Sequence, residues 1–392
     1  MAEKAGALLD LVPSSANRQI DWQAIEQSQI RRYITKMQQT QQNPVWHAEG
    51  DVWTHTKMVC EELIRLPAFW QQERRKQEEL FVAALLHDIG KIPCTQLEDG
   101  VWTSPNHTAV GARMAREFLW TEYGCCGTEE LQIFRETVCN LIRYHSVPPH
   151  IMDQSDPARR LLKIAANGEL VPDFSIRLLC LFEAADMRGR ISDSVDESLE
   201  LVRLCAEMAT ECGCLDAPGE FPDAFSEYAY LSGRNILPGQ PLYDDTWGEV
   251  ILLSGLPGTG KDTWIREHCP GYPVVSLDDI RRKMKISPKD NQGVVAQAAR
   301  EQARGYLRKK IPFVWNATDL TPLIRGKQVS LFEDYHASVR IIYLETDWET
   351  RRQRNEGRAE AEFVPESAVC QMLGNLILPE RFEAHRVEWK CV

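Results

Sequence analysis

The chain contains 392 residues, which is long enough for two or three domains that each bury a core of their own. Its composition, 43% hydrophobic and 26% charged, is typical of globular proteins and excludes a largely disordered chain. The sequence has no apolar run of about 18 residues and no basic flank at its N-terminus, which argues against a membrane protein and favours a cytoplasmic location.

The net charge of −12 argues against indiscriminate binding to nucleic acid, but the charge is unevenly distributed. Residues 1–246 contain 23 Lys and Arg against 37 Asp and Glu, whereas residues 247–392 contain 22 against 20. A polyanion would therefore bind to the second half, with an affinity that falls as salt rises. The 12 cysteines show no paired CxxC spacing, which indicates reduced, mostly buried thiols.

Residues 1–43 predict a helical lead-in, and the segments after it place histidine and aspartate at the ends of apolar helices. His55 follows the turn AEGD, and the apolar run Leu80–Leu86 ends in the pair His87-Asp88. A histidine beside an aspartate at the end of a buried helix costs too much desolvation free energy to stand without partners or a metal ion. Three more residues of these types each open or follow a predicted helix: His107, His145 and Asp186.

Five segments over roughly residues 44–195 resemble the motifs of HD-domain phosphohydrolases. In chain order they are HTKMV, LLHDIGK, NHTAVGA, IRYH and FEAAD. WHAEGDVWTHT also resembles the opening of the HD region attached to some bacterial tRNA nucleotidyltransferases. The resemblance implies an all-α domain, which we place at residues 44–215, that binds one or two divalent metals. The ligands that it implies are His55, His87, Asp88, His107, His145 and Asp186, with Asp88 bridging two ions.

Imidazole and carboxylate ligands suit Mn, Co, Ni, Zn or Fe, and such an ion acidifies water into a nucleophile near neutral pH. Asp88 and Lys91 are therefore candidate catalytic residues; Lys91 either contacts a phosphate oxygen or is a solvated lysine. Four further residues lie near this set but outside the motif positions, and we assign them no role: His47, His150, Arg188 and Arg190.

Residues 216–246, rich in Gly, Pro and Asp, predict a linker to a second domain at residues 247–392. There a buried strand at Val250–Leu253 is followed by G-x-x-x-x-G-K, a loop whose backbone amides cradle phosphates while Lys261 reaches the β- and γ-phosphates. A helix should begin near Asp262, with its positive end toward the same anion. The predicted nucleotide-binding residues are Gly255, Leu256, Pro257, Gly258, Thr259, Gly260, Lys261, Asp262 and Thr263.

Beyond this loop, strands predicted at residues 274–277, 311–317 and 339–345 alternate with helices. This alternation predicts an α/β domain, a parallel sheet flanked by helices, with its ligand at the carboxyl ends of the strands.

Charged residues follow these strands at positions suited to phosphoryl transfer. Asp278 and Asp279 end the strand at 274–277, where one carboxylate can accept the proton of an attacking hydroxyl while the other caps a helix; Arg281 follows within one turn. Arg354 and Arg358, four residues apart on one predicted helix face, would close over a triphosphate.

This arrangement is similar to the phage-type 5′-hydroxyl polynucleotide kinases in the loop GLPGTGKDTW, the segment DDIRR and the lid W-x5-R-N-x-x-R. One departure is Asp262, which stands where that family has the Ser or Thr that ligates Mg²⁺; a carboxylate could ligate the ion or repel the phosphates. The resemblance implies that Lys261 stabilises the transferred phosphoryl group, Asp278 is the general base, Arg281 contacts the acceptor, and Arg354 and Arg358 contact the donor.

An HD domain followed by such a kinase resembles the two-domain HD-kinase proteins of bacterial RNA repair. The resemblance implies that ATP or another NTP with Mg²⁺ phosphorylates 5′-OH ends, and that the HD domain removes 2′,3′-cyclic phosphate or a 2′- or 3′-phosphate. The implied partners are nucleic-acid ends, RNA in the first place, and a separate RNA ligase. Two alternatives stay open: an HD nucleotidase fused to a nucleoside or nucleotide kinase, and an ATP-driven regulatory RNA-binding protein.

Overall fold

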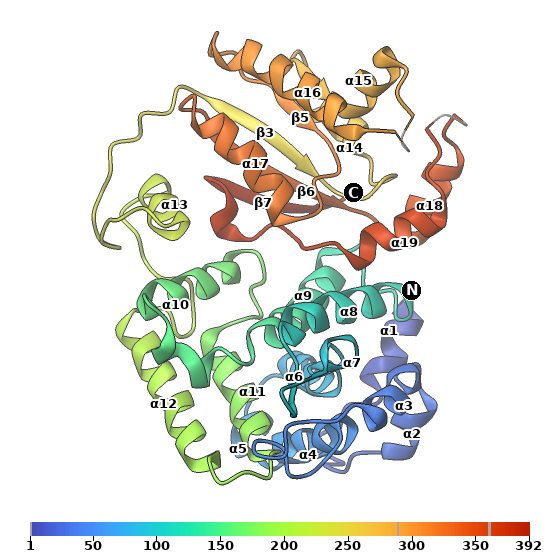
Figure 1. Cartoon of the computed structure of the whole chain (residues 1–392), viewed down its shortest axis with the longest axis vertical. Helices are drawn as coiled ribbons and strands as arrows, with labels where there is room; N and C mark the ends of the chain where they lie inside the picture. Colours follow the sequence, from blue (N-terminus) through green and yellow to red (C-terminus); the bar gives the residue numbers. More distant parts are fainter. Residues whose placement is uncertain (1, 288–289, 360–361) are drawn as a thin grey trace. The chain divides into compact units, whose positions relative to one another are not determined.

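The computed structural model describes residues 2–287, 290–359 and 362–392, which form two compact units (Figure 1). The first unit ends at Glu220 and the second begins at Phe221, with Gly127–Glu129 grouped with the second. No helix in the described part of the chain is long and apolar enough to cross a membrane.

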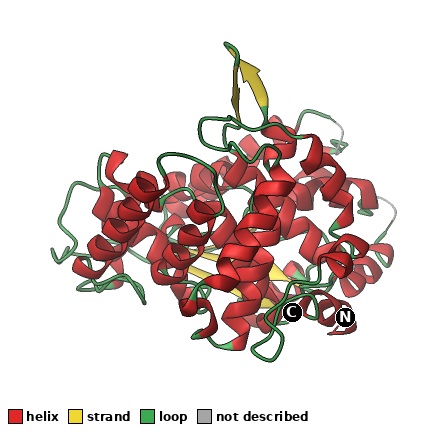
Figure 2. Cartoon of the chain, turned by 90° about the horizontal axis from the view of Figure 1, so that it is seen from below, coloured by secondary structure: helices red, strands yellow, loops and turns green. Residues whose placement is uncertain are grey.

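The first unit is helical, as the sequence predicted. One addition is a hairpin of two short antiparallel strands, β1 (Gln96–Glu98) and β2 (Val101–Thr103), which projects from the helices in Figure 2. Its turn, Asp99-Gly100, has positive φ at both residues, the geometry that joins two strands through two residues. The helices are α1 (Ala2–Leu9), α2 (Trp22–Gln27), α3 (Arg31–Gln39), α4 (Val52–Arg65), α5 (Pro67–Trp70), α6 (Arg74–Leu86), α7 (Lys91–Cys94), α8 (His107–Thr121), α9 (Glu129–Tyr144), η1 (Pro148–Asp153), α10 (Pro157–Ala166), η2 (Asn167–Glu169), α11 (Ile176–Arg188) and α12 (Val195–Glu211).

The helices that carry the predicted metal ligands begin where their sequences dictate. The side chain of Asp51 accepts hydrogen bonds from the amides of Trp53 and Thr54 and so caps α4. Ser175 caps α11 in the same way. The apolar run Leu80–Leu86 of α6 is buried throughout, so this helix passes through the core and delivers the residues after it into the interior.

The second unit contains a five-stranded sheet in the order β4-β5-β3-β6-β7, and every strand pair in it is parallel. The predicted α/β fold is therefore confirmed. Because β5 lies between β3 and β4, the strand before the phosphate loop and the strand before Asp278 are not neighbours. The elements are α13 (Ala224–Ser232), β3 (Glu249–Ser254), α14 (Lys261–His268), β4 (Val274–Ser276), α15 (Leu277–Met284), α16 (Gln292–Leu307), β5 (Val314–Asn316), α17 (Pro322–Glu333), β6 (Ser338–Glu345), α18 (Trp348–Glu356), α19 (Glu366–Gly374), η3 (Arg381–Glu383) and β7 (Arg386–Cys391).

The core of this unit fixes the segment that holds the phosphate loop. Ile251 and Leu253 of β3 belong to one buried cluster with Trp264 and Ile265 of α14. Strand and helix are thus packed on both sides of the loop between them, which holds its backbone in place.

The linker predicted at residues 216–246 contains a helix that the sequence analysis did not anticipate. Asp223 caps α13, whose Phe225, Tyr228 and Leu231 are buried. Glu227 of this helix pairs with Arg381 of η3 at 2.5 Å, and both side chains are nearly inaccessible. The segment from Phe221 onward is therefore part of the second unit rather than a free connection.

Candidate active sites

The six predicted metal ligands converge in the core of the first unit. His55 Nε2 lies 2.9 Å from Asp186 Oδ1 and 3.6 Å from Asp88 Oδ2, and His87 Nε2 lies 3.2 Å from the same Asp88 oxygen. On the other side of Asp88, its Oδ1 lies 3.6 Å from His107 Nε2. The ligand atoms form two groups that share Asp88: His55, His87 and Asp88, and then Asp88, His107 and His145.

The histidine rings are oriented so that the same nitrogen of each can face a metal ion. The Nδ1 atoms of His87, His107 and His145 lie 2.8–2.9 Å from main-chain carbonyl oxygens three residues earlier. His55 Nδ1 lies 3.1 Å from the carbonyl oxygen of Gly189. A proton on each Nδ1 would leave Nε2 with a free lone pair, which is the arrangement usual in metal-bound histidine.

The chemistry of this donor set fits a metal ion. Burial lowers the pKa of His145 to about 3, so its ring is neutral at pH 7. Burial alone would raise the pKa of Asp88, but the charges of His87 and Lys91 outweigh it and hold this pKa well below its usual range. Asp88 Oδ1 is buried and accepts no hydrogen bond from the described residues. A neutral imidazole beside an ionised carboxylate with an unused oxygen is what a divalent transition metal requires.

Two glycines allow the elements that hold the ligands to approach one another. A Cβ atom at Gly90 would lie 2.0 Å from the carbonyl oxygen of His107, and one at Gly189 would lie 2.7 Å from the amide nitrogen of Val59. The first contact brings α8 against the His87-Asp88 pair, and the second brings the end of α11 against α4. A side chain at Gly90 would force α8 away from the His87-Asp88 segment, and one at Gly189 would force the end of α11 away from α4.

Replacing Gly90 with alanine is therefore expected to impair the metal centre. The new methyl group would push α8 away and separate His107 from Asp88, and such overpacking should lower the free energy of unfolding by about 1–3 kcal/mol. Metal content per chain and thermal unfolding are the measurements. Gly6→Ala is the matched control, because a Cβ atom there meets nothing within 4 Å; equal metal content in both variants would contradict this account.

Lys91 lies beside the predicted metal ligands rather than in solvent. Its Nζ is 2.8 Å from Asp88 Oδ2, donates to Gln42 Oε1 at 2.8 Å and lies 3.5 Å from His47 Nε2. The ammonium therefore balances the charge of the carboxylate that the two ligand groups share. The surface alternative that the sequence left open for Lys91 is wrong, because the residue is buried.

Several residues of this site were not predicted. Arg190, to which the sequence analysis assigned no role, places Nη2 2.6 Å from Asp186 Oδ2. Glu183 is fully buried, and burial together with the charges of Asp186 and Asp88 raises its pKa well above its usual value. Glu183 precedes Asp186 by one helical turn in an otherwise apolar helix, which is the signal that could have identified it. His47 and Glu49 also reach the centre, from the loop before α4.

The predicted phosphate loop lies between β3 and α14. Gly258 and Gly260 have φ of 89° and 86°, a region that other residues rarely adopt. A Cβ atom at Gly258 would lie 2.7 Å from the carbonyl oxygen of Arg351, so the loop also packs closely against α18. The helix begins at Lys261, one residue earlier than the sequence predicted. The loop residues Gly255, Leu256 and Thr259 are buried, and Asp262 and Thr263 are exposed.

The Lys261 ammonium is folded onto its own loop. Its Nζ donates to the carbonyl oxygens of Gly255 at 2.8 Å and Leu256 at 2.9 Å. Burial and the charge of Arg358 lower its pKa to about 8, against the opposing charges of Asp262, Asp278 and Asp319. A bound polyphosphate would supply the missing negative charge and favour the ammonium form.

The acidic pair after β4 lies in the first turn of α15. The cap of this helix is Ser276, whose hydroxyl accepts from the Asp279 amide, so neither aspartate caps it. Asp278 is 76% exposed and pairs with Arg281, whose Nε donates to Gln292. The carboxylate predicted as base is therefore accessible and held by the arginine predicted to contact the acceptor.

Asp262, the departure from the polynucleotide kinase pattern, is fixed by a neighbouring strand. Its Oδ1 accepts from the side-chain amide of Asn316, at the end of β5, at 2.7 Å. The adjacent Thr263 hydroxyl accepts from Arg266 at 3.0 Å. Asp262 therefore keeps one oxygen unused by this bond at the position where the family places its Mg²⁺ ligand.

The two lid arginines do not share a helix face, contrary to the prediction. The helix α18 ends at Glu356 and Gly357 follows as its cap, so Arg358 lies beyond it. Arg354 lies against the loop, since a Cβ atom at Gly260 would be 3.2 Å from its Nη1. Both cations are thus near the loop, but only one is positioned by the helix.

One further carboxyl group lies near Lys261 and was not predicted. Asp319 is buried, and burial raises its pKa to about 6 despite a 2.9 Å hydrogen bond from Trp315 Nε1. Its position three residues after β5, at the carboxyl edge of the sheet, is the signal that could have singled it out.

Comparison with known protein families matches residues 51–184 to the HD domain and residues 250–379 to an AAA domain. Among curated proteins, the chain is similar to heterogeneous nuclear ribonucleoprotein U-like protein 2 of Mus musculus and of Homo sapiens. Each is 26% identical over 150 residues, which is 34% of this chain and 20% of the relative. The chain thus spans about a fifth of the length of these relatives. With the two sites above, these matches show that the chain combines a hydrolase-type HD domain with a P-loop domain of the kinase type.

Proposed function

We propose that the protein heals broken RNA ends: its second unit phosphorylates 5′-OH ends with an NTP, and its first unit removes 2′,3′-cyclic phosphate or a 2′- or 3′-phosphate. RNA broken by transesterification carries both defects, and a separate ligase needs both corrected. The resemblance of the two halves to an RNA-repair pair supports the substrate, as does the name ribonucleoprotein that two similar proteins carry. The cellular location implied is the cytoplasm.

In the hydrolase half, His55, His87, Asp88 and Asp186 would hold one ion, and Asp88, His107 and His145 a second. A bound Mn, Co, Ni, Zn or Fe ion supplies a Lewis acid that lowers the pKa of water. Lys91 balances the charge of Asp88 and presents an ammonium next to the centre, where it can meet a phosphate oxygen. Arg190 holds Asp186 through its second oxygen and so fixes the direction of the first.

In the kinase half, the loop amides and Lys261 bind the donor phosphates, and Asp262 would ligate Mg²⁺. Asp278 accepts the proton of the 5′-hydroxyl, while Arg281, which already pairs with it, contacts the acceptor phosphate. Arg354 and Arg358 offset the charge that builds on the transferred group.

The observation that supports this proposal most is that the six predicted metal ligands lie together, with Asp88 shared by two groups of them and Asp186 against His55, in a chain that also contains the predicted phosphate loop. The decisive test uses a short RNA with a 5′-OH and a 2′,3′-cyclic phosphate, incubated with ATP, Mg²⁺ and each transition metal in turn. Conversion of both ends is expected. A free nucleoside is offered in parallel, and phosphorylation of the nucleoside alone would replace the proposal with a small-molecule kinase.

Replacing Asp278 with asparagine should slow 5′ phosphorylation by about 10²–10⁴-fold and leave ATP affinity within a few-fold, because a general base acts on the transfer step and not on donor binding. Asp279→Asn is the matched control, since Asp279 pairs with Arg282 instead. Initial rates and ATP binding would be measured for both. Unchanged transfer in the Asp278 variant removes this residue from the mechanism and favours a protein that only binds or hydrolyses ATP.

A further inference from the structure

A short loop before α4 reaches the metal centre from outside the predicted ligand set. We call residues 42–50 the metal-centre loop; an antiparallel bridge between Gln41 and Asp51 closes its ends. Gln42 and His47 contact the Lys91 ammonium, as described above. The third side chain, Glu49, makes the contacts that matter most for the metal ligands.

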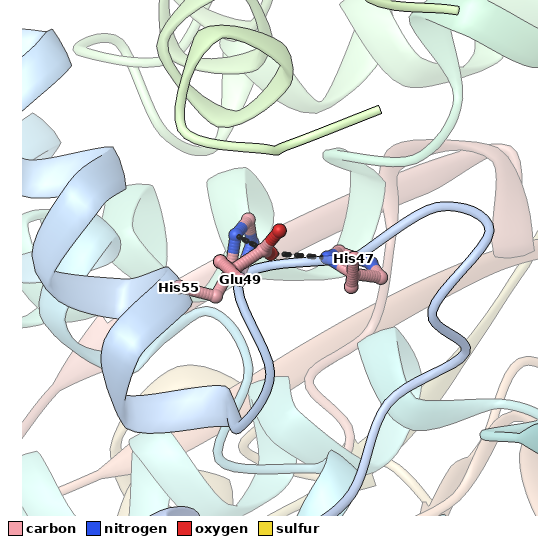
Figure 3. A group of neighbouring side chains, drawn as sticks. All are labelled: His47, Glu49 and His55. Atoms are coloured by element: carbon pink, nitrogen blue, oxygen red, sulfur yellow. Dashed lines mark hydrogen bonds and ion pairs between the residues drawn. The ribbon is translucent and has the colours of Figure 1, made fainter. Parts of the chain in front are cut away.

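The Glu49 carboxylate is 1% exposed and joins three segments. Its Oε1 lies 2.8 Å from His47 Nδ1 and 3.1 Å from His55 Nδ1 (Figure 3). Its Oε2 accepts from the amide of Ile191 at 2.9 Å. A single carboxylate thus ties the metal-centre loop to a predicted ligand, His55, and to the turn that follows Asp186.

His55 differs from the other three histidines of the centre in how it is oriented. The other rings each face a carbonyl oxygen three residues earlier in the chain, so their orientation is local. His55 has no such partner in the described part of the chain; its Nδ1 faces Glu49 and the Gly189 carbonyl oxygen, both from other segments. Its tautomer and ring direction therefore depend on tertiary contacts, of which the carboxylate is the stronger acceptor.

We propose that Glu49 is a positioning residue of the HD metal centre, which holds the proton of His55 on Nδ1 and turns Nε2 toward the metal. A carboxylate in this place also makes the coordinating nitrogen a better donor. The inference rests on the proposed metal binding of this centre. It assigns Glu49 no contact with substrate.

The same three side chains, His47, Glu49 and His55, offer atoms close enough to hold a cation of their own. Two features argue against that use. Lys91 Nζ lies 3.5 Å from the His47 ring and places a positive charge beside it. The Glu49 oxygen also lies at hydrogen-bond distance from both rings, which suits shared protons better than a shared ion.

The test measures metal affinity rather than hydrolysis. The full-length protein is stripped with a chelator and titrated with Mn²⁺, and the free ion is followed by electron paramagnetic resonance. Glu49→Ala should weaken Mn²⁺ binding about 10–100-fold, and Glu49→Gln, whose amide oxygen still accepts from His55, should weaken it less but measurably. The number of ions bound at saturation should not change; loss of one equivalent would show a separate cation site and overturn the positioning role.

Asp51→Ala is the matched control, because Asp51 caps the same helix and lies next to the loop, but its side chain bonds only to Trp53 and Thr54 among the described residues. It should lower Tm and leave Mn²⁺ affinity within twofold. An unchanged affinity in the Glu49 variants, or an equal loss in Asp51→Ala, overturns the proposal. If circular dichroism shows that Glu49→Ala does not fold, the Mn²⁺ affinity of Glu49→Gln alone tests the proposal. Absence of Mn²⁺ binding in the unaltered protein would instead overturn the proposed hydrolase.

Discussion

Replacing Asp88 with alanine is expected to abolish release of phosphate from a 2′,3′-cyclic or 3′-phosphate end and to reduce the metal content of the protein. Asp88 is the one residue that the two ligand groups share, with Oδ2 3.2 Å from His87 and Oδ1 3.6 Å from His107. Its removal takes a negatively charged ligand from both groups at once. Product analysis on a labelled RNA and metal analysis of the purified protein are the measurements.

The alanine variant also leaves the buried ammonium of Lys91 without its carboxylate, which should cost about 3–5 kcal/mol of stability. Asp88→Asn separates this effect from the loss of metal, because an amide oxygen keeps a polar atom beside Lys91 Nζ but carries no charge. It should fold better than the alanine variant and remain inactive.

A suitable control is Glu79→Gln, which changes another buried carboxyl group of the first unit. Burial and the nearby Asp173 raise the pKa of Glu79 to about 9, so this substitution alters no charge at neutral pH. Phosphorylation of 5′-OH ends should persist in every variant, because the phosphate loop lies in the other compact unit. If a folded Asp88 variant lost both activities, the conclusion that the hydrolase and kinase sites act independently would be wrong.

The cluster of histidine and aspartate residues could be predicted, because these residues are unfavourable at the ends of buried helices unless they have partners or a metal ion. His87 and Asp88 follow the seven buried apolar residues Leu80–Leu86, and no ordinary helix end requires a histidine and an aspartate there. The phosphate loop could be predicted as well, since glycines and a lysine at G-x-x-x-x-G-K spacing follow an apolar run, and in the structure these glycines have positive φ between a strand and a helix.

The residues that support these ligands could not be predicted, because their partners are distant in sequence. Glu49 accepts a hydrogen bond from the amide of Ile191, which is 142 positions away in the sequence. The sequence around a glutamate in a turn does not indicate that its side chain is buried. Arg190 sits at a helix end, where a solvated arginine is the usual case. The position of Arg358 was predicted wrongly because Gly357 ends α18 before the second lid arginine. Helix termini depend on such caps more than on the pattern of charges.

Replacing Lys261 with alanine is expected to lower 5′ phosphorylation by at least about 10²–10³-fold, because a cation aimed at the developing charge acts where water is excluded. Among the residues that the structure describes, the ammonium bonds only to carbonyl oxygens of its own loop, so its loss should cost the fold little. Hydrolysis of the cyclic phosphate should continue near its original rate. The measurement compares the rates of 5′ phosphorylation and of cyclic-phosphate hydrolysis on one RNA that carries a 5′-OH and a 2′,3′-cyclic phosphate.

The pH dependence of ATP binding tests the same residue in the unaltered protein. Since burial and Arg358 lower the pKa of Lys261 to about 8, the ammonium loses its proton as pH rises through that value, and the affinity for ATP should fall. The alanine variant should bind weakly at every pH and show no such decline. Lys309→Ala controls for the loss of a lysine, since Lys309 is exposed and precedes β5 at its amino end. A Lys261 variant that keeps more than a tenth of the transfer rate would show that the loop amides alone hold the donor.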